Sequence, residues 1–119
     1  MTQRTRPYRA ISSEEIAVIE RALSVAPTAD FHPELLATLA QLRVVDVCGC
    51  GCASVEFTRL PQGELPHIVA DACAETADGD SLGVIVWAFD GSVSGLEIYS
   101  FSDRPAPLPV LSSIVSYGP

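Results

Sequence analysis

The fold is decided by residues 82–101, which read Leu82-Gly-Val-Ile-Val-Trp-Ala-Phe89, then Asp90-Gly91, then Ser92-Val-Ser-Gly-Leu-Glu-Ile-Tyr-Ser-Phe101. An Asp-Gly pair between two apolar segments rich in β-branched residues is the strongest short-range signal of a β-hairpin. The type I′ turn of such a hairpin needs positive φ at both central residues, which Asp and Gly tolerate. A two-residue turn predicts that Phe89 pairs with Ser92 and that Trp87 pairs with Ser94.

A second turn, Asp78-Gly79, indicates that a strand at 65–76 pairs with the strand at 82–89. If this turn also has two residues, Ala70 lies opposite Trp87. The two registers agree on which side chains share a face, and a slip of one residue would reverse every side chain. The face predicted to be buried carries Val55, Phe57, Ile68, Ala70, Ala72, Ala74, Ile85, Trp87, Phe89, Leu96 and Ile98.

Further elements precede these strands. A period of two from Val44 onward predicts strands at 43–48 and 53–60, and the loop at 61–64 would join the second of these to the strand at 65–76. Ser12 followed by Glu15 is a capping box that begins a helix, and Pro33 suits the first position of another. The predicted fold class is therefore α+β, with two N-terminal helices packed on one face of a roughly five-stranded antiparallel meander sheet.

The chain has the size of one domain. It contains 119 residues, of which 48% are hydrophobic, enough for a core of its own. Residues 1–11 are basic and contain proline, which predicts a flexible tail. Residues 12–119 are then expected to form a single α+β domain.

The least ordinary segment is Cys48-Gly-Cys-Gly-Cys52. In an extended strand its thiols would lie about 6.5 Å apart, too far to share one ion. Gly49 and Gly51 permit positive φ, so the segment can fold into a tight turn in which the thiols converge. The C-x-C-x-C spacing differs from the C-x2-C of a zinc knuckle.

The predicted strand register adds a fourth thiol to this segment. If the loop at 61–64 pairs Leu60 with Leu65, Cys52 lies directly opposite Cys73, at about 4.5–5.5 Å between Cβ atoms. A zinc ion held by four thiolates is then expected, with the ligands Cys48, Cys50, Cys52 and Cys73. Two alternatives stay open: cysteines that only fill a crowded turn, and a redox or catalytic thiol.

The opposite face of the predicted sheet is acidic. It collects Glu56, Asp71, Glu75, Glu97 and Tyr99, together with His67 and Cys73 among several valines. The formal net charge is −8, and residues 44–119 carry ten acidic residues against two arginines. Such a surface repels nucleic acid and anionic lipid and favours a basic protein partner, although the charge also serves solubility.

Several function classes are excluded or disfavoured. The chain has no lysine and no asparagine, which excludes Schiff-base and Walker-type lysine chemistry as well as N-glycosylation. No apolar segment resembles a signal peptide or a membrane span, so we expect a cytoplasmic protein whose thiols are reduced or metal-bound. A thiol enzyme would pair a cysteine with His32 or His67, and neither lies in the sequence context of a known family.

Two segments together resemble a group of small uncharacterised bacterial proteins. They are Cys48-Gly-Cys-Gly-Cys-Ala-Ser-Val55 and Asp90-Gly-Ser-Val-Ser-Gly-Leu-Glu-Ile-Tyr-Ser100, a cysteine segment followed by a D-G hairpin and an L-E-V-Y-type strand. The resemblance covers about the last two-thirds of the chain and implies one domain, with no activity attached to it.

The leading functional expectation is a small cytoplasmic binding or regulatory protein whose acidic sheet face meets a basic partner. An immunity-type inhibitor of a basic toxin would fit this charge pattern. The alternatives are a small zinc-binding protein with a four-cysteine site and a thiol-dependent enzyme. We expect a binding protein rather than an enzyme.

Overall fold

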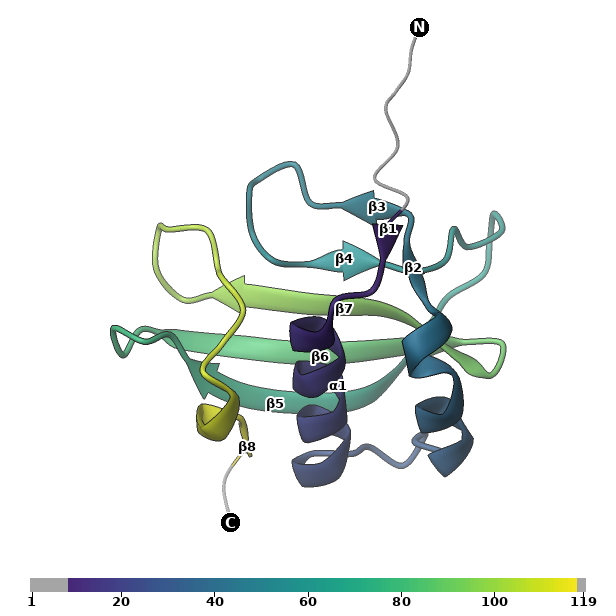
Figure 1. The fold of residues 1–119 in the computed structure, drawn as a ribbon, viewed down its shortest axis with the longest axis horizontal. Helices are drawn as coiled ribbons and strands as arrows, with labels where there is room; N and C mark the ends of the chain where they lie inside the picture. Colours follow the sequence, from purple (N-terminus) through teal and green to yellow (C-terminus); the bar gives the residue numbers. More distant parts are fainter. Residues whose placement is uncertain (1–8, 118–119) are drawn as a thin grey trace, which may run out of the picture.

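A six-stranded antiparallel sheet dominates the computed structural model, which describes residues 9–117 (Figure 1). Its strand order is β3-β4-β7-β6-β5-β8. The strands are β3 (Asp46–Val47), β4 (Val55–Glu56), β5 (His67–Glu75), β6 (Ser81–Phe89), β7 (Ser92–Ser100) and β8 (Val115–Ser116). A separate two-stranded ladder joins β1 (Arg9–Ala10) to β2 (Arg43–Val44).

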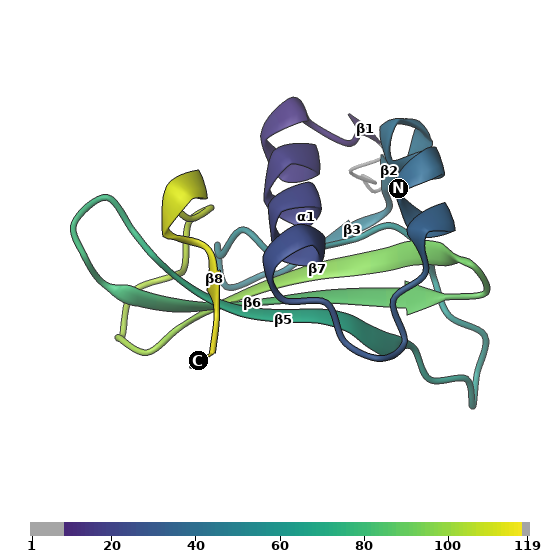
Figure 2. The same ribbon diagram turned by 90° about the horizontal axis from the view of Figure 1, so that it is seen from below.

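Within residues 9–117, helical segments cover one face of the sheet and leave the other face open (Figure 2). The covering segments are the α-helix α1 (Ser13–Val25) and the 3-10 helix η1 (Pro33–Gln41), while the short 3-10 helix η2 (Leu111–Ser113) precedes β8. The capping box predicted at the start of α1 is present in full, with Ser12 and Glu15 bonded reciprocally. In contrast, His32 provides no side-chain cap for η1, which buries only Leu35 and Leu39.

The predicted fold class is wrong in two respects. The second helix is a 3-10 helix, so there is no pair of N-terminal α-helices packed on the sheet. The sheet is also not a five-stranded meander, because β4 pairs with β7 and β3 instead of β5. Pro61 and Pro66 lie in the segment that was expected to form the missing hairpin, and proline has no N–H to donate to a ladder. Residues 57–66 therefore connect β4 to β5 without pairing them.

The Asp90-Gly91 turn forms as predicted. Asp90 has a φ of 53° and Gly91 a φ of 83°, and Phe89 pairs with Ser92. One pair further, however, a β-bulge occurs in β7: Ala88 pairs with Val93, but Trp87 pairs with Gly95. Ser94 is the extra residue, so the register beyond it is shifted by one.

The other turn differs from the prediction by one residue. The Gly79 N–H donates to the Thr76 carbonyl, and the Thr76 N–H donates to Asp80. Gly79 has a φ of 89°, which identifies a three-residue loop with glycine in the left-handed position. Glu75 therefore pairs with Ser81, one residue away from the predicted register.

These two register shifts place each side chain of β6 on the face opposite to the predicted one. Its residues Leu82, Val84, Val86 and Ala88 face the helices and are buried, together with Val69 and Val93. Ile85, Trp87 and Phe89 were predicted in the core, but they lie half-buried on the open face. Ile68 was also predicted in the core, but it is half-buried and pairs directly with Trp87. The remaining residues of the predicted buried face are buried as expected: Val55, Phe57, Ala70, Ala72, Ala74, Leu96 and Ile98.

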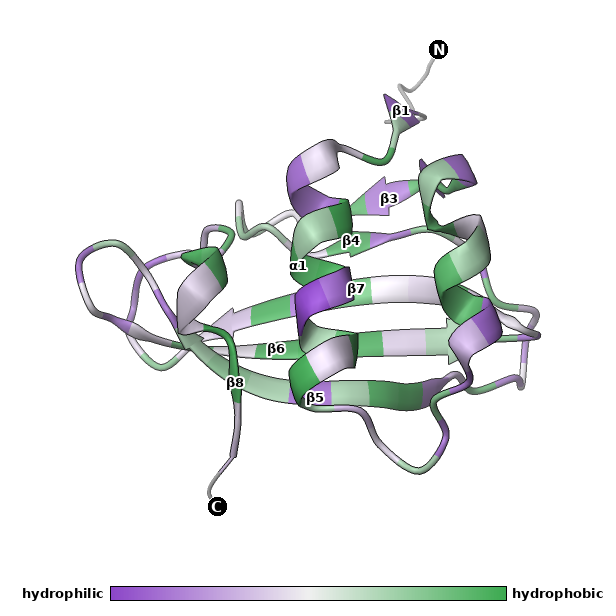
Figure 3. Cartoon of the chain, turned by 60° about the horizontal axis from the view of Figure 1, so that its bottom comes forward, coloured by the Kyte–Doolittle hydropathy of each residue, from purple (hydrophilic) through white to green (hydrophobic). Residues whose placement is uncertain are grey.

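The core lies between α1 and the three long strands. Figure 3 shows hydrophobic residues, in green, along β5, β6 and β7 where α1 crosses them. From the helix, Val18, Ile19, Ala22 and Leu23 are buried, as the 3.6-residue spacing of an amphipathic helix requires.

Segments near both ends of the described chain pair with other strands. Residues 1–8 of the predicted basic tail lie outside the described residues, whereas Arg9 and Ala10 pair with β2 and Ile11 is buried. At the other end, β8 pairs with the middle of β5 and protects part of that edge. None of the helices within residues 9–117 is long and apolar enough to cross a membrane.

Candidate functional site

The cysteine segment forms the loop between β3 and β4. The two strands pair antiparallel, and the Cys48 N–H donates to the Ser54 carbonyl at 3.4 Å. The Gly51 N–H then donates to the Cys48 carbonyl at 3.4 Å, and Gly51 has a φ of 93°. A residue with a Cβ would be strained at this φ, so glycine is what allows the chain to turn back here.

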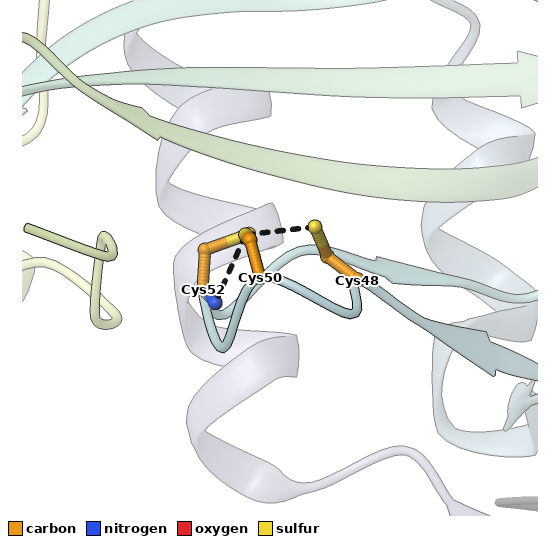
Figure 4. A group of neighbouring side chains, drawn as sticks. All are labelled: Cys48, Cys50 and Cys52. Carbon is orange, nitrogen blue, oxygen red and sulfur yellow. Dashed lines mark hydrogen bonds between the residues drawn. The ribbon is translucent and has the colours of Figure 1, made fainter.

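This turn brings three thiols together (Figure 4). The sulfur atoms of Cys48, Cys50 and Cys52 all lie within 4.8 Å of one another, and the first two are 2.8 Å apart. Three sulfur ligands on a tetrahedral zinc ion, each about 2.3 Å from the metal, lie about 3.8 Å from one another. The cluster is therefore compact enough to hold a metal ion after small adjustments.

The fourth predicted ligand is not part of this cluster. Cys73 lies on β5 and pairs with Val115 of β8, and its thiol contacts the carbonyls of Val115 and Ser116 at 3.6 and 3.7 Å. The prediction that Cys52 faces Cys73 is wrong, because it required a hairpin between β4 and β5. In the sheet these two strands are separated by β7 and β6.

The loop shifts the pKa values of Cys50 and Cys52 in opposite directions. A hydrogen bond with the Cys48 thiol is the main reason that the pKa of Cys50 is raised to about 11. Burial by itself would raise the pKa of Cys52. Hydrogen bonding with Ser54 and with the neighbouring thiols outweighs burial and lowers that pKa to about 7. Cys52 therefore ionises more readily than Cys50.

Ser54 also fastens the loop to the sheet, a role that the sequence did not indicate. Its hydroxyl donates to the Ile98 carbonyl at 3.1 Å and accepts the Ile98 N–H at 2.8 Å, so it replaces a backbone partner for β7. The neighbouring Ala53 N–H donates to the Ala106 carbonyl at 2.7 Å. These bonds hold the thiol loop against β7 and the C-terminal segment.

The five residues predicted to form the acidic face all lie on the open side of the sheet. Glu56 pairs with Gly95, while Asp71 and Glu97 flank Ile85 on either side. Glu75 and Tyr99 follow on the same sides of their strands. A role of this surface in binding stays a prediction.

Trp87 also belongs to this surface, although its sequence context predicts it in the core. Its indole N–H donates to Glu97 Oε1 at 3.2 Å. The indole lines two adjoining hollows of about 320 and 270 Å³, which also share Glu56, Gly95 and Glu97. Gly95 has no side chain to fill the space above the indole, and the glycine was the sequence signal for both the hollow and the bulge.

The thiol loop and the acidic surface adjoin each other. Cys48 lines the larger of the two hollows at Trp87, and it also lines a third hollow of about 390 Å³. The third hollow contains all three loop cysteines together with Glu97, Tyr99 and Arg104. A cation in the thiol cluster would therefore share this hollow with the carboxylate of Glu97 and also with the guanidinium of Arg104.

Comparisons of the chain with protein-family models, with curated proteins and with solved structures found no match. The resemblance to small bacterial proteins stays a prediction. The chemistry proposed below is therefore argued from this chain's own geometry.

Proposed function

We propose that the chain is a metal-binding protein that holds one zinc ion through the thiolates of Cys48, Cys50 and Cys52. The observation that carries the proposal is the approach of the three sulfur atoms to within 4.8 Å of one another. A ligand set made only of thiolates favours soft or borderline ions such as Zn²⁺ and Cu⁺ over Mg²⁺ or Ca²⁺. A reducing cytoplasm would keep these thiols available.

The coordination number supports a site with an open position. Structural zinc sites have four protein ligands, whereas sites that bind a water or a substrate have three. Here Cys48 and Cys50 are exposed, and the three thiols line a hollow that is open to solvent. The fourth position would therefore be filled by water or by an incoming ligand.

The metal content can be tested by comparing the three loop cysteines with Cys73, which serves as the control. Reduced, metal-free protein is titrated with zinc against a chromogenic chelator, and the loaded protein is weighed by native mass spectrometry. We expect one zinc ion per chain in the wild type and in Cys73→Ser, whose cysteine lies outside the loop. Replacing all three loop cysteines by serine should abolish binding.

X-ray absorption of the loaded protein then identifies the ligands. We expect three sulfur neighbours at about 2.3 Å and one oxygen neighbour. The proposal is wrong if Cys73→Ser loses the ion as completely as the triple variant does, or if no zinc binds at micromolar concentration.

A second function is favoured by one distance. The 2.8 Å between the sulfurs of Cys48 and Cys50 lies between a disulfide bond of about 2.05 Å and an ordinary contact. With hydrogen peroxide as the oxidant, the two thiols would lose two protons and two electrons and form one S–S bond, while the O–O bond of the peroxide breaks and two waters form. This chemistry corresponds to a redox thiol protein.

The same protein sample distinguishes the two functions. A metal-binding protein is protected from oxidation when zinc is bound, and its disulfide form binds no zinc. A redox protein reacts with peroxide equally fast with and without zinc in the solution. Peptide mapping of the oxidised protein locates the bond, which should join Cys48 to Cys50 and leave Cys73 free.

A further inference from the structure

We propose that the hollow at Trp87 is the docking site for an arginine side chain presented by a basic segment of a partner protein. The proposal concerns the open face of the sheet and is independent of metal binding in the thiol loop. It depends on the shape of the hollow, its charge and the apolar residues around it.

The hollow has an aromatic wall and a fixed carboxylate. The Trp87 indole lines both of its parts, and Gly95 leaves the indole uncovered where another residue would place a side chain. Glu97 accepts a hydrogen bond from the indole N–H, which holds one of its oxygens in place. The larger part, about 320 Å³, is at the small end of the range for ligand sites and suits one side chain.

The charge of the hollow selects a cation. Asp46, Glu56 and Glu97 line its two parts, and no arginine or histidine lines either part within residues 9–117. A cation above an indole gains from the negative face of the ring, and a guanidinium group can also bond a carboxylate with two parallel N–H groups. A planar guanidinium stacks on an aromatic ring better than a compact ammonium group does.

Apolar residues around the hollow indicate a protein partner. Val47 lines the hollow and is 47% exposed, and Leu65, directly before the lining residue Pro66, is 80% exposed. At the far end of the open face, Phe101 is 67% exposed and packs edge-on against Tyr99. An acidic hollow flanked by the exposed apolar side chains of Val47 and Leu65 is complementary to a basic segment with apolar flanks.

The test uses the only tryptophan of the chain as its reporter. The full-length protein is titrated with a short synthetic peptide of alternating arginine and glycine, and Trp87 emission is followed. The control ligand is the same peptide with citrulline in place of arginine, which keeps the shape and removes the charge. We expect saturable binding of the arginine peptide that weakens as salt rises, and no binding of the citrulline peptide.

Matched glutamate variants locate the site. Glu97→Gln keeps an oxygen that can accept the indole N–H, so the double variant Glu56→Gln, Glu97→Gln should remain folded. We expect it to weaken peptide binding about tenfold, which corresponds to about 1.4 kcal/mol. Glu20→Gln, an exposed change on the helix that covers the other face, should leave binding unchanged.

Three results would overturn the proposal. Equal weakening by Glu20→Gln would mean that the peptide is attracted only by the net charge. Binding of the citrulline peptide with similar affinity would remove the role of the guanidinium group. Free arginine amide binding as tightly as the peptide would identify a small-molecule site in place of a protein docking surface.

Discussion

Replacing Gly83 by alanine is the sharpest test of the open face. Gly83 is the third residue of β6 and lies opposite Tyr99 of β7, and the tyrosine ring lies over it. An added Cβ would be 2.0 Å from Tyr99 Cζ and 2.4 Å from its hydroxyl oxygen. Side-chain atoms do not approach this closely, so the whole ring must move away.

The expected cost follows from the contacts that the ring would lose. The Tyr99 hydroxyl is hydrogen-bonded to the Tyr117 hydroxyl at 3.1 Å, which contributes about 1 kcal/mol. Its edge-on contact with Phe101, at 5.5 Å between ring centres, contributes about 0.5–1.5 kcal/mol. Alanine in a strand recovers about 0.5–1 kcal/mol relative to glycine. We therefore expect Gly83→Ala to lower the free energy of unfolding by about 0.5–2 kcal/mol, which overlaps the usual range for overpacking.

Gly95→Ala is the matched control in the neighbouring strand. Its added Cβ would lie 3.6 Å from the Val55 carbonyl oxygen and 3.8 Å from Trp87 Cδ1, which are ordinary contacts. Its φ is negative, unlike that of the turn glycines. We expect this variant to be about 0.4–1 kcal/mol more stable than the wild type, because alanine reduces the freedom of the unfolded chain.

The assay is urea unfolding followed by far-ultraviolet circular dichroism, with a double-mutant cycle. Tyr99→Ala removes the ring, so adding Gly83→Ala to it should cost nothing further. If Gly83→Ala is as stable as the wild type, or if its cost persists without the ring, Tyr99 does not lie over Gly83. The assignment of the open face would then be wrong.

Three further predictions concern the core, acid stability and zinc. Leu82→Ala should cost about 2–5 kcal/mol in urea unfolding because Leu82 is fully buried, whereas Ile85→Ala should cost less than half as much; equal costs would contradict the observed register. Burial raises the pKa of Glu15, but hydrogen bonds from Arg9 and the Ser12 N–H leave it below its usual value. Its ionised form therefore stabilises the fold above that usual value, and the contribution is lost as the pH falls through the lowered pKa. Glu15→Gln should destabilise the protein at neutral pH and flatten the acid limb of a pH-stability curve; an unchanged limb would contradict this. Saturating zinc should raise the melting temperature of the wild type and leave a variant without the three loop cysteines unchanged.

The hairpins illustrate what local sequence predicts about this fold. Asp90-Gly91 imposes its own turn because both residues adopt positive φ, and the pair Phe89–Ser92 follows directly. The bulge at Ser94 cannot be predicted in the same way. Side chains alternate between the two faces of the strand before and after the extra residue, so the alternation does not mark its position. Gly95, inside a strand, was the available signal.

Local and long-range features of the thiol site also differ in how well they are predicted. The convergence of the loop thiols depends on the chain turning back at Gly51, and this tendency is encoded within the segment itself. The position of Cys73 depends on which strands pair across the sheet. Its predicted partner, Cys52, lies next to β4, and β4 does not pair with β5. Ser54 is one of many serines, and only the structure gives it two bonds to Ile98.

The two proposed sites are electrostatically compatible although they adjoin. A zinc ion bound to three thiolates carries a net charge of about −1, so the loaded loop remains negative. Glu97 lies between the sites, lining the hollow of the thiols and both parts of the hollow at Trp87. Loading the loop therefore neither neutralises nor reverses the field that would attract an arginine.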